Sequence, residues 1–135
     1  MVRTSWRCLA IIALSLSALS CKDGGNIPVQ SLSIPIGAFQ YTGYDEAGNI
    51  IETGWLKLVV SDPNNVVGTW QLHTRGSGEL RGAIENGRVV VDLNPRFVDN
   101  NFILDGTIQN GIYSGSWSQI GFGGVMGSGR FEARQ

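Results

Sequence analysis

From Ile36 onward the chain alternates apolar and polar residues with a period of two, and turn residues interrupt the pattern at regular spacing. Such alternation is typical of strands with one buried face, and no window shows the spacing of a helix. The pattern predicts eight strands, at residues 36–44, 50–60, 66–73, 78–85, 88–93, 101–108, 112–119 and 127–134. Short strands with turn signals about every twelve residues indicate a sandwich or a barrel.

Glycine falls on the apolar face of strand after strand. An inward glycine lets a strand bend sharply and makes room for large neighbouring rings. We therefore expect an all-β fold, an eight-stranded antiparallel up-and-down β-barrel, which leaves no open sheet edge. The glycines that lead to this expectation are Gly68, Gly82, Gly106, Gly115 and Gly129.

The connections between the predicted strands differ in length. Asp62–Asn65 carries a proline suited to a type I turn, and Asn86-Gly87 and Asn110-Gly111 are typical of type I′ hairpins. In an up-and-down barrel these tight turns share one end, and the longer connections share the other. We expect the longer loops at residues 45–49, 74–77, 94–100 and 120–126. Function tends to lie on loops held by a rigid scaffold, so we take the long-loop end as the binding face. Its candidate residues are His73, Arg75, Arg96, Phe97, Phe122 and Met126.

The first twenty residues have the layout of a secretory signal. Residues 1–7 carry two arginines and no acid, and residues 9–19 are apolar or small apart from serines. The apolar run is shorter than the roughly 20 residues that span a bilayer. We expect cleavage after Ser20, a flexible tether over residues 21–35, and a barrel domain over residues 36–135.

Residues 16–21 (LSALSC) resemble the cleavage region of a bacterial lipoprotein. The resemblance implies that Cys21 receives a diacylglycerol, with palmitate-type acyl chains, and becomes the first residue of the mature chain. It also implies a lipid anchor in a membrane of the bacterial cell envelope. The alternative is ordinary secretion, with Cys21 as a terminal thiol. Cys8 leaves with the signal in either case, so the barrel holds no internal disulfide.

Charge and candidate chemistry exclude several function classes. Loss of residues 1–20 removes two arginines and no acid, which leaves eight basic and eleven acidic residues. The basic residues do not cluster as they do on a nucleic-acid-binding surface. His73 has no further zinc ligands at suitable spacing and no identifiable catalytic partners. Asp92 and Asp105 are the one candidate carboxylate pair, since they fall on adjacent outward faces. We expect no metal, no cofactor and no enzymatic activity.

The apolar face also carries large aromatic residues that line the predicted interior. An eight-stranded barrel is just wide enough to be filled by side chains or to hold one small ligand. A packed core and a ligand-holding interior both remain possible from the sequence, because buried tyrosine hydroxyls need hydrogen-bond partners that either the protein or a ligand supplies. The ligand-binding candidates on this face are Tyr41, Trp70, Phe102, Tyr113 and Trp117.

Three segments resemble the small barrels of the lipocalin and avidin type. They are Gly68-Thr69-Trp70, residues 78–82 (GELRG) and residues 113–117 (YSGSW). The resemblance implies a calycin-like barrel, and it carries over no biotin-contacting residue. We therefore expect a lipid-anchored, non-enzymatic binding module for a small apolar ligand or an envelope protein. The alternative is an inhibitor or assembly factor that acts on another protein through the same loops.

Overall fold

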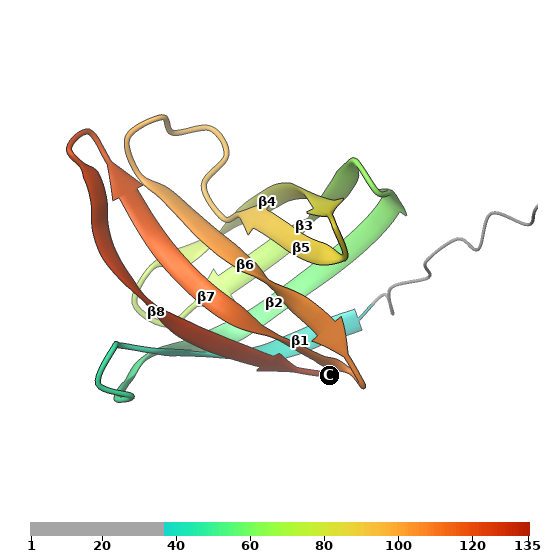
Figure 1. The fold of residues 1–135 in the computed structure, drawn as a ribbon, viewed down its shortest axis with the longest axis horizontal. Coiled ribbons are helices and arrows are strands. Elements are labelled where there is room, and N and C mark those ends of the chain that lie inside the picture. The colour runs from blue at the N-terminus through green and yellow to red at the C-terminus, as the bar shows by residue number, and fades with distance from the viewer. Residues whose placement is uncertain (1–36) are drawn as a thin grey trace, which may run out of the picture. The chain divides into compact units, whose positions relative to one another are not determined.

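The computed structural model describes residues 37–135, and that range is all-β (Figure 1). Within it, no helix is long and apolar enough to cross a membrane. The expected signal sequence, Cys21, the tether and Ile36 lie outside the described residues. The strands are β1 (Gly37–Tyr44), β2 (Ile50–Asp62), β3 (Asn65–Leu72), β4 (Gly76–Glu85), β5 (Arg88–Asp92), β6 (Asn101–Gln109), β7 (Ile112–Gly121) and β8 (Gly124–Arg134).

The eight strands form one closed antiparallel barrel. Each strand pairs with its neighbours in sequence, and β1 also pairs with β8, from Gln40 opposite Arg134 to Tyr44 opposite Arg130. This confirms the predicted up-and-down barrel, and the architecture is consistent with the lipocalin and avidin type. Seven of the eight predicted strands agree with the structure in place and order, with ends that differ by at most two residues.

The tight turns take the conformations that their residues predict. Asn86 and Gly87 have φ values of 51° and 77°, and Asn110 and Gly111 have 51° and 76°. Positive φ at both central residues is the mark of a type I′ hairpin. Pro63 and Asn64 link β2 to β3, where Asn64 N donates to Asp62 Oδ1 at 2.9 Å.

The prediction of a long loop over residues 120–126 is wrong. β7 and β8 continue as a paired hairpin to Gly121 opposite Gly124, and only Phe122 and Gly123 form the turn. A register shift between Gln119 and Ile120 accommodates this extension. The cluster of glycines in this segment suggested a loop, but a glycine-rich ribbon still pairs through its backbone. The β5–β6 connection, by contrast, is a long loop as expected.

The inward glycines allow neighbouring strands to approach very closely. A Cβ added to Gly115 would lie 2.1 Å from Asp105 O, and one added to Gly82 would lie 1.9 Å from Val90 O. The interior they surround is filled by a cluster of buried apolar side chains that includes the aromatic residues predicted to line it. These rings are Phe39, Tyr41, Trp70, Phe102, Tyr113, Trp117 and Phe131.

Both ends of the described chain lie at the tight-turn end of the barrel. Gln135 N donates to Gly111 O at 3.0 Å, which places the C-terminus beside the β6–β7 turn (Figure 1). Gly37, at the start of β1, lies against the side chain of Gln135. Any segment that precedes β1 therefore joins the barrel opposite the β1–β2, β3–β4 and β5–β6 loops, as the predicted topology requires. We call the end that holds these loops and the β7–β8 turn the loop end.

Candidate functional site

A buried carboxylate organises the loop end. Glu52 on β2 points into the barrel and is 5% exposed. It accepts hydrogen bonds from Thr74 N at 3.0 Å, from the Thr74 hydroxyl and from Thr53 N at 3.1 Å, and its Oε2 lies 3.9 Å from Arg75 Nε. The carboxylate therefore fixes the three-residue β3–β4 loop over the barrel mouth. Sequence reasoning missed Glu52, and the one available signal was its inward position in the alternation of β2.

Arg75 extends from this loop across the mouth of the barrel. Its guanidinium lies over the Phe102 ring, 4.2 Å from the centroid, and its Nη2 donates to Gln119 Oε1 at 3.2 Å. Gln119 Nε2 in turn donates to Asn100 Oδ1 at 3.0 Å. The structure thus brings two predicted candidates, Arg75 and Phe102, into direct contact, and a cation–π contact of this kind is favourable.

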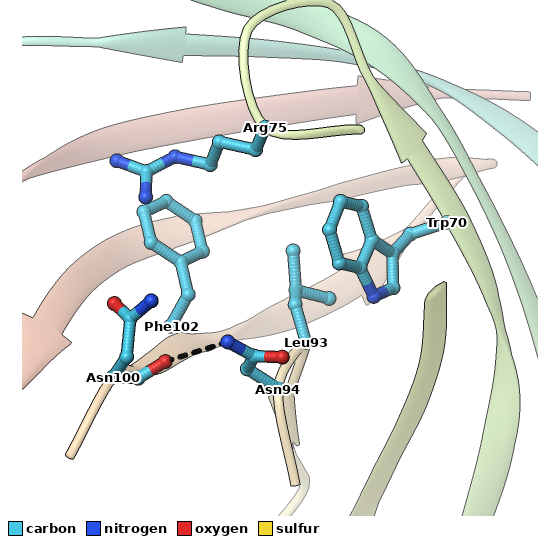
Figure 2. Close-up of a pocket in the computed structure, with 6 residues that line it drawn as sticks. All are labelled: Trp70, Arg75, Leu93, Asn94, Asn100 and Phe102. Atoms are coloured by element: carbon cyan, nitrogen blue, oxygen red, sulfur yellow. Dashed lines mark hydrogen bonds between the residues drawn. The ribbon is translucent and has the colours of Figure 1, made fainter. Parts of the chain in front are cut away.

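A cavity of about 190 Å³ lies beside Arg75 at the mouth. Figure 2 shows the guanidinium above Phe102 on one side and the Trp70 indole on the other, with Leu93 between them. Asn94 and Asn100 complete the wall, and Asn94 Nδ2 donates to Asn100 O at 3.0 Å. The cavity therefore combines apolar rings with amide and guanidinium groups, a lining that suits a small ligand with a polar edge.

A second cavity, of about 290 Å³, lies on the other flank of Trp70. It shares Trp70, Leu93 and Asn94 with the mouth cavity, so the two adjoin. Its other lining residues are Ser77, Gly78, Glu79, Pro95, Arg96 and Phe97. Two further predicted candidates, Arg96 and Phe97, thus belong to this outer cavity, where Arg96 Nη2 pairs with Glu79 Oε2 at 2.7 Å.

The remaining aromatic candidates have different surroundings. Trp117 stacks on Phe102 with ring centroids 5.4 Å apart and donates from Nε1 to Tyr44 O at 2.8 Å. It therefore supports the Phe102 ring, which lines the mouth cavity. Tyr113 follows the β6–β7 turn and lies away from the mouth, and its hydroxyl donates to Val89 O at 2.9 Å. The structure therefore does not bring Tyr113 into the candidate site.

Tyr41 is fully buried, and its hydroxyl has no hydrogen-bond partner among residues 37–135. Burial raises the pKa of Tyr41 above its ordinary value, and the nearby charge of Glu52 raises it further, while Arg75 acts in the opposite direction. Burial likewise raises the pKa of Tyr113. Both phenols are therefore neutral in the folded barrel at physiological pH.

Each of the other polar candidates has its own surroundings. His73 is exposed on the β3–β4 loop. Asp92 accepts from Asn94 N at 2.8 Å and from the Asn101 amide, whereas Asp105 pairs with Arg88 Nε at 2.7 Å. No group of three or more His, Cys, Asp or Glu side chains within residues 37–135 could hold a metal ion.

Exposed apolar side chains surround the mouth. Phe122, at the tip of the β7–β8 hairpin, is 91% exposed, and Val98 and Phe97 on the β5–β6 loop are 89% and 61% exposed. Sequence reasoning identified Phe97, Phe122 and Met126 but missed Val98 and the other exposed apolar residues at this end. We refer to the exposed apolar residues at this end as the apolar rim, which consists of Ile50, Ile51, Phe97, Val98, Ile120, Phe122, Val125 and Met126.

Comparisons of the chain with protein-family models, with curated proteins and with solved structures found no match.

Proposed function

We propose that this protein is a non-enzymatic binding module of the bacterial cell envelope, anchored through a lipid on Cys21, that holds a partner protein with the loop end of its barrel. The apolar rim is the observation that carries the proposal. Large apolar side chains exposed together at one end of a small domain are typical of interaction sites. Aromatic and methionine side chains are also enriched in protein interfaces.

The filled interior favours a protein partner over a carried apolar ligand. Buried side chains occupy the barrel along its length. The mouth cavity of about 190 Å³ and the adjoining outer cavity of about 290 Å³ are each smaller than the roughly 300–1,000 Å³ of typical ligand pockets. A small apolar ligand with a polar edge is the second candidate function, and Arg75, Asn94 and the flanking rings are the residues that support it.

The topology also supports the anchored arrangement. The chain enters β1 at the tight-turn end, beside the C-terminus, so a tether attached there leaves the apolar rim free to meet a partner. An inhibitor or assembly factor would use the same surface. Activity or assembly of the captured partner, measured with and without this protein, separates that role from simple binding.

Site-specific photo-crosslinking in bacterial cells that produce the protein tests the partner hypothesis. A photoreactive residue at Phe122 or Val98 is expected to give a discrete crosslinked protein. The matched controls at Asn64 and Asn86, on exposed turns at the opposite end, are expected to give none. Equal crosslinking from both ends, or none from the rim, would contradict the proposal.

The lipid anchor has its own test. Cys21→Ala is expected to move the protein from the membrane fraction to the soluble fraction of the envelope, while Cys8→Ala leaves it in the membrane fraction. Retention of the Cys21→Ala protein in membranes would refute the anchor without bearing on the apolar rim.

A further inference from the structure

The barrel wall is incomplete at the loop end, between β4 and β5. β4 pairs with β3 along residues 76–82, but its ladder with β5 stops at Arg81 opposite Asp92. Beyond that point β5 ends, and Leu93 N stays bonded to Phe102 O of β6 at 2.9 Å while the β5–β6 loop leaves the wall (Figure 1). Within residues 37–135, the first five residues of β4 therefore have a strand on one side only.

Unpaired backbone groups of β4 face this gap. Hydrogen-bonded and non-bonded pairs alternate along an antiparallel ladder. The two-residue Asn86-Gly87 turn closes on a bonded pair, so the odd-numbered residues of β4 direct their N–H and C=O groups toward the β5 side. Ser77 and Glu79 belong to this set and have no strand opposite them in the described range. Glu79 O accepts from Trp70 Nε1 at 3.2 Å, so the indole stands in for one missing strand contact.

The outer cavity of about 290 Å³ occupies the place of the missing strand. Residues 77–79 of β4 line one side, residues 93–97 line the other, and Trp70 lies between them. An indole fits there because residue 78 is glycine, and a Cβ on Gly78 would lie 3.1 Å from the ring. The exposed Arg96–Glu79 ion pair crosses the gap. Exposed pairs of this kind contribute little free energy, so this one separates readily when a competing group arrives.

We propose that this gap is the docking site for an extended peptide segment of the partner protein, which adds a strand to the open edge of β4. The inference rests on the proposed function, because it takes the partner to be a protein. Main-chain hydrogen bonds supply affinity in strand addition, and pockets for alternate side chains supply specificity. The N–H groups of Ser77 and Glu79 and the carbonyl of Ser77, which have no strand opposite them in the described range, select a peptide over an acyl chain, since an acyl chain offers them no hydrogen bonds.

The lining of the gap also defines the sequence of the peptide. One side chain of the added strand enters the outer cavity against Trp70 and Leu93, which favours an apolar residue there. Strand addition separates Glu79 from Arg96, and Arg96 is then free to pair with an acidic side chain on the outward face of the peptide. The expected segment therefore alternates apolar and polar residues and carries an acid.

Selection from a phage-displayed library of random peptides on the purified full chain tests this site. Binding of each selected peptide is measured by fluorescence anisotropy to the wild type, to Glu79→Ala and to Glu79→Pro. Both variants lose the carboxylate, but only the proline variant loses the N–H that faces the gap. The proline variant is expected to bind roughly tenfold more weakly than the alanine variant, the effect of one hydrogen bond. Arg81→Pro removes an N–H that does pair with β5, and it is expected to lower the melting temperature far more than Glu79→Pro.

A second measurement works on the wild type and does not depend on the folding of a variant. N-methylation of each peptide position in turn is expected to abolish binding at every second residue, because only alternate N–H groups face β4. Failure to select peptides, or a methylation pattern without a period of two, would overturn the inference. If dodecanoate displaced the peptide, the occupant of the gap would be an acyl chain. If the chain formed a dimer that Glu79→Pro abolished, the occupant would be a second copy of the chain. Either result would also overturn the inference. Crosslinking at the apolar rim would still stand in each case, so the two proposals fail separately.

Discussion

The two tyrosines in the barrel interior offer a sharp test of the structure, because only one of their hydroxyls has a partner. Tyr113 donates to Val89 O at 2.9 Å and lies 3.3 Å from Leu104 O. The Tyr41 hydroxyl is equally buried and has no hydrogen-bond partner among residues 37–135. Substitution of each by phenylalanine removes one oxygen atom from the same core and leaves both rings in place.

The two substitutions should change stability in opposite directions. Tyr113→Phe loses a buried hydrogen bond, which lowers the free energy of unfolding by about 1 kcal/mol. Tyr41→Phe removes a hydroxyl whose burial without a partner costs about 1–3 kcal/mol, so we expect a gain of about 1 kcal/mol. The variants therefore differ by about 2 kcal/mol, which corresponds to roughly 10 °C in melting temperature for a domain of this size.

Urea unfolding, followed by tryptophan fluorescence and by circular dichroism, measures both changes. The slope with urea concentration should stay the same in all variants, so that the midpoints report stability alone. Tyr44→Phe, at a partly exposed ring, serves as the control and should change little. A loss of stability in Tyr41→Phe as large as that in Tyr113→Phe would mean that the Tyr41 hydroxyl has a partner, and the reasoning would fail.

Three further predictions follow from the site and the core. Glu52→Ala removes the hydrogen bonds that hold the β3–β4 loop and should lower the free energy of unfolding by about 2 kcal/mol in urea titrations. Gly115→Ala, with its Cβ against Asp105 O, should cost about 3 kcal/mol, whereas Gly123→Ala, with open space around it, should cost almost nothing. Burial raises the pKa of both interior tyrosines, so their contribution to the free energy of unfolding should be fully present below pH ~10 and should fall as the pH rises above it. Phenolate absorbance from these two residues should appear only as the barrel unfolds.

Most of the barrel could be predicted because its strands follow one rule. Apart from Gln119 near the end of β7, inward positions are apolar or glycine from β3 to β8, and Asn-Gly turns fix the register of two hairpins. The rule fails at Glu52, where a carboxylate takes an inward position. Its burial depends on Thr74 and Arg75, which approach it only after β2 and β3 pair, and no local pattern reveals such partners. The rule also fails at the end of β7, where backbone pairing extends a ribbon whose glycines suggested a loop.

The gap beside β4 could not be predicted from alternation, yet local chemistry explains it. β5 ends because Asp92 Oδ1 accepts from Asn94 N at 2.8 Å, which turns the chain away from the ladder. If β5 continued in register, Asn94 would lie opposite Glu79 and Pro95 opposite Gly78. The Asn94 backbone N–H, which would face β4, is already bonded to Asp92 Oδ1, and Pro95 has no N–H with which to extend the pairing of β5 with β6. The chain is therefore unable to close its own wall at this point. Because the Asn86-Gly87 turn pins β5 at the opposite end, the opening falls at the loop end, beside the apolar rim and within reach of the same partner.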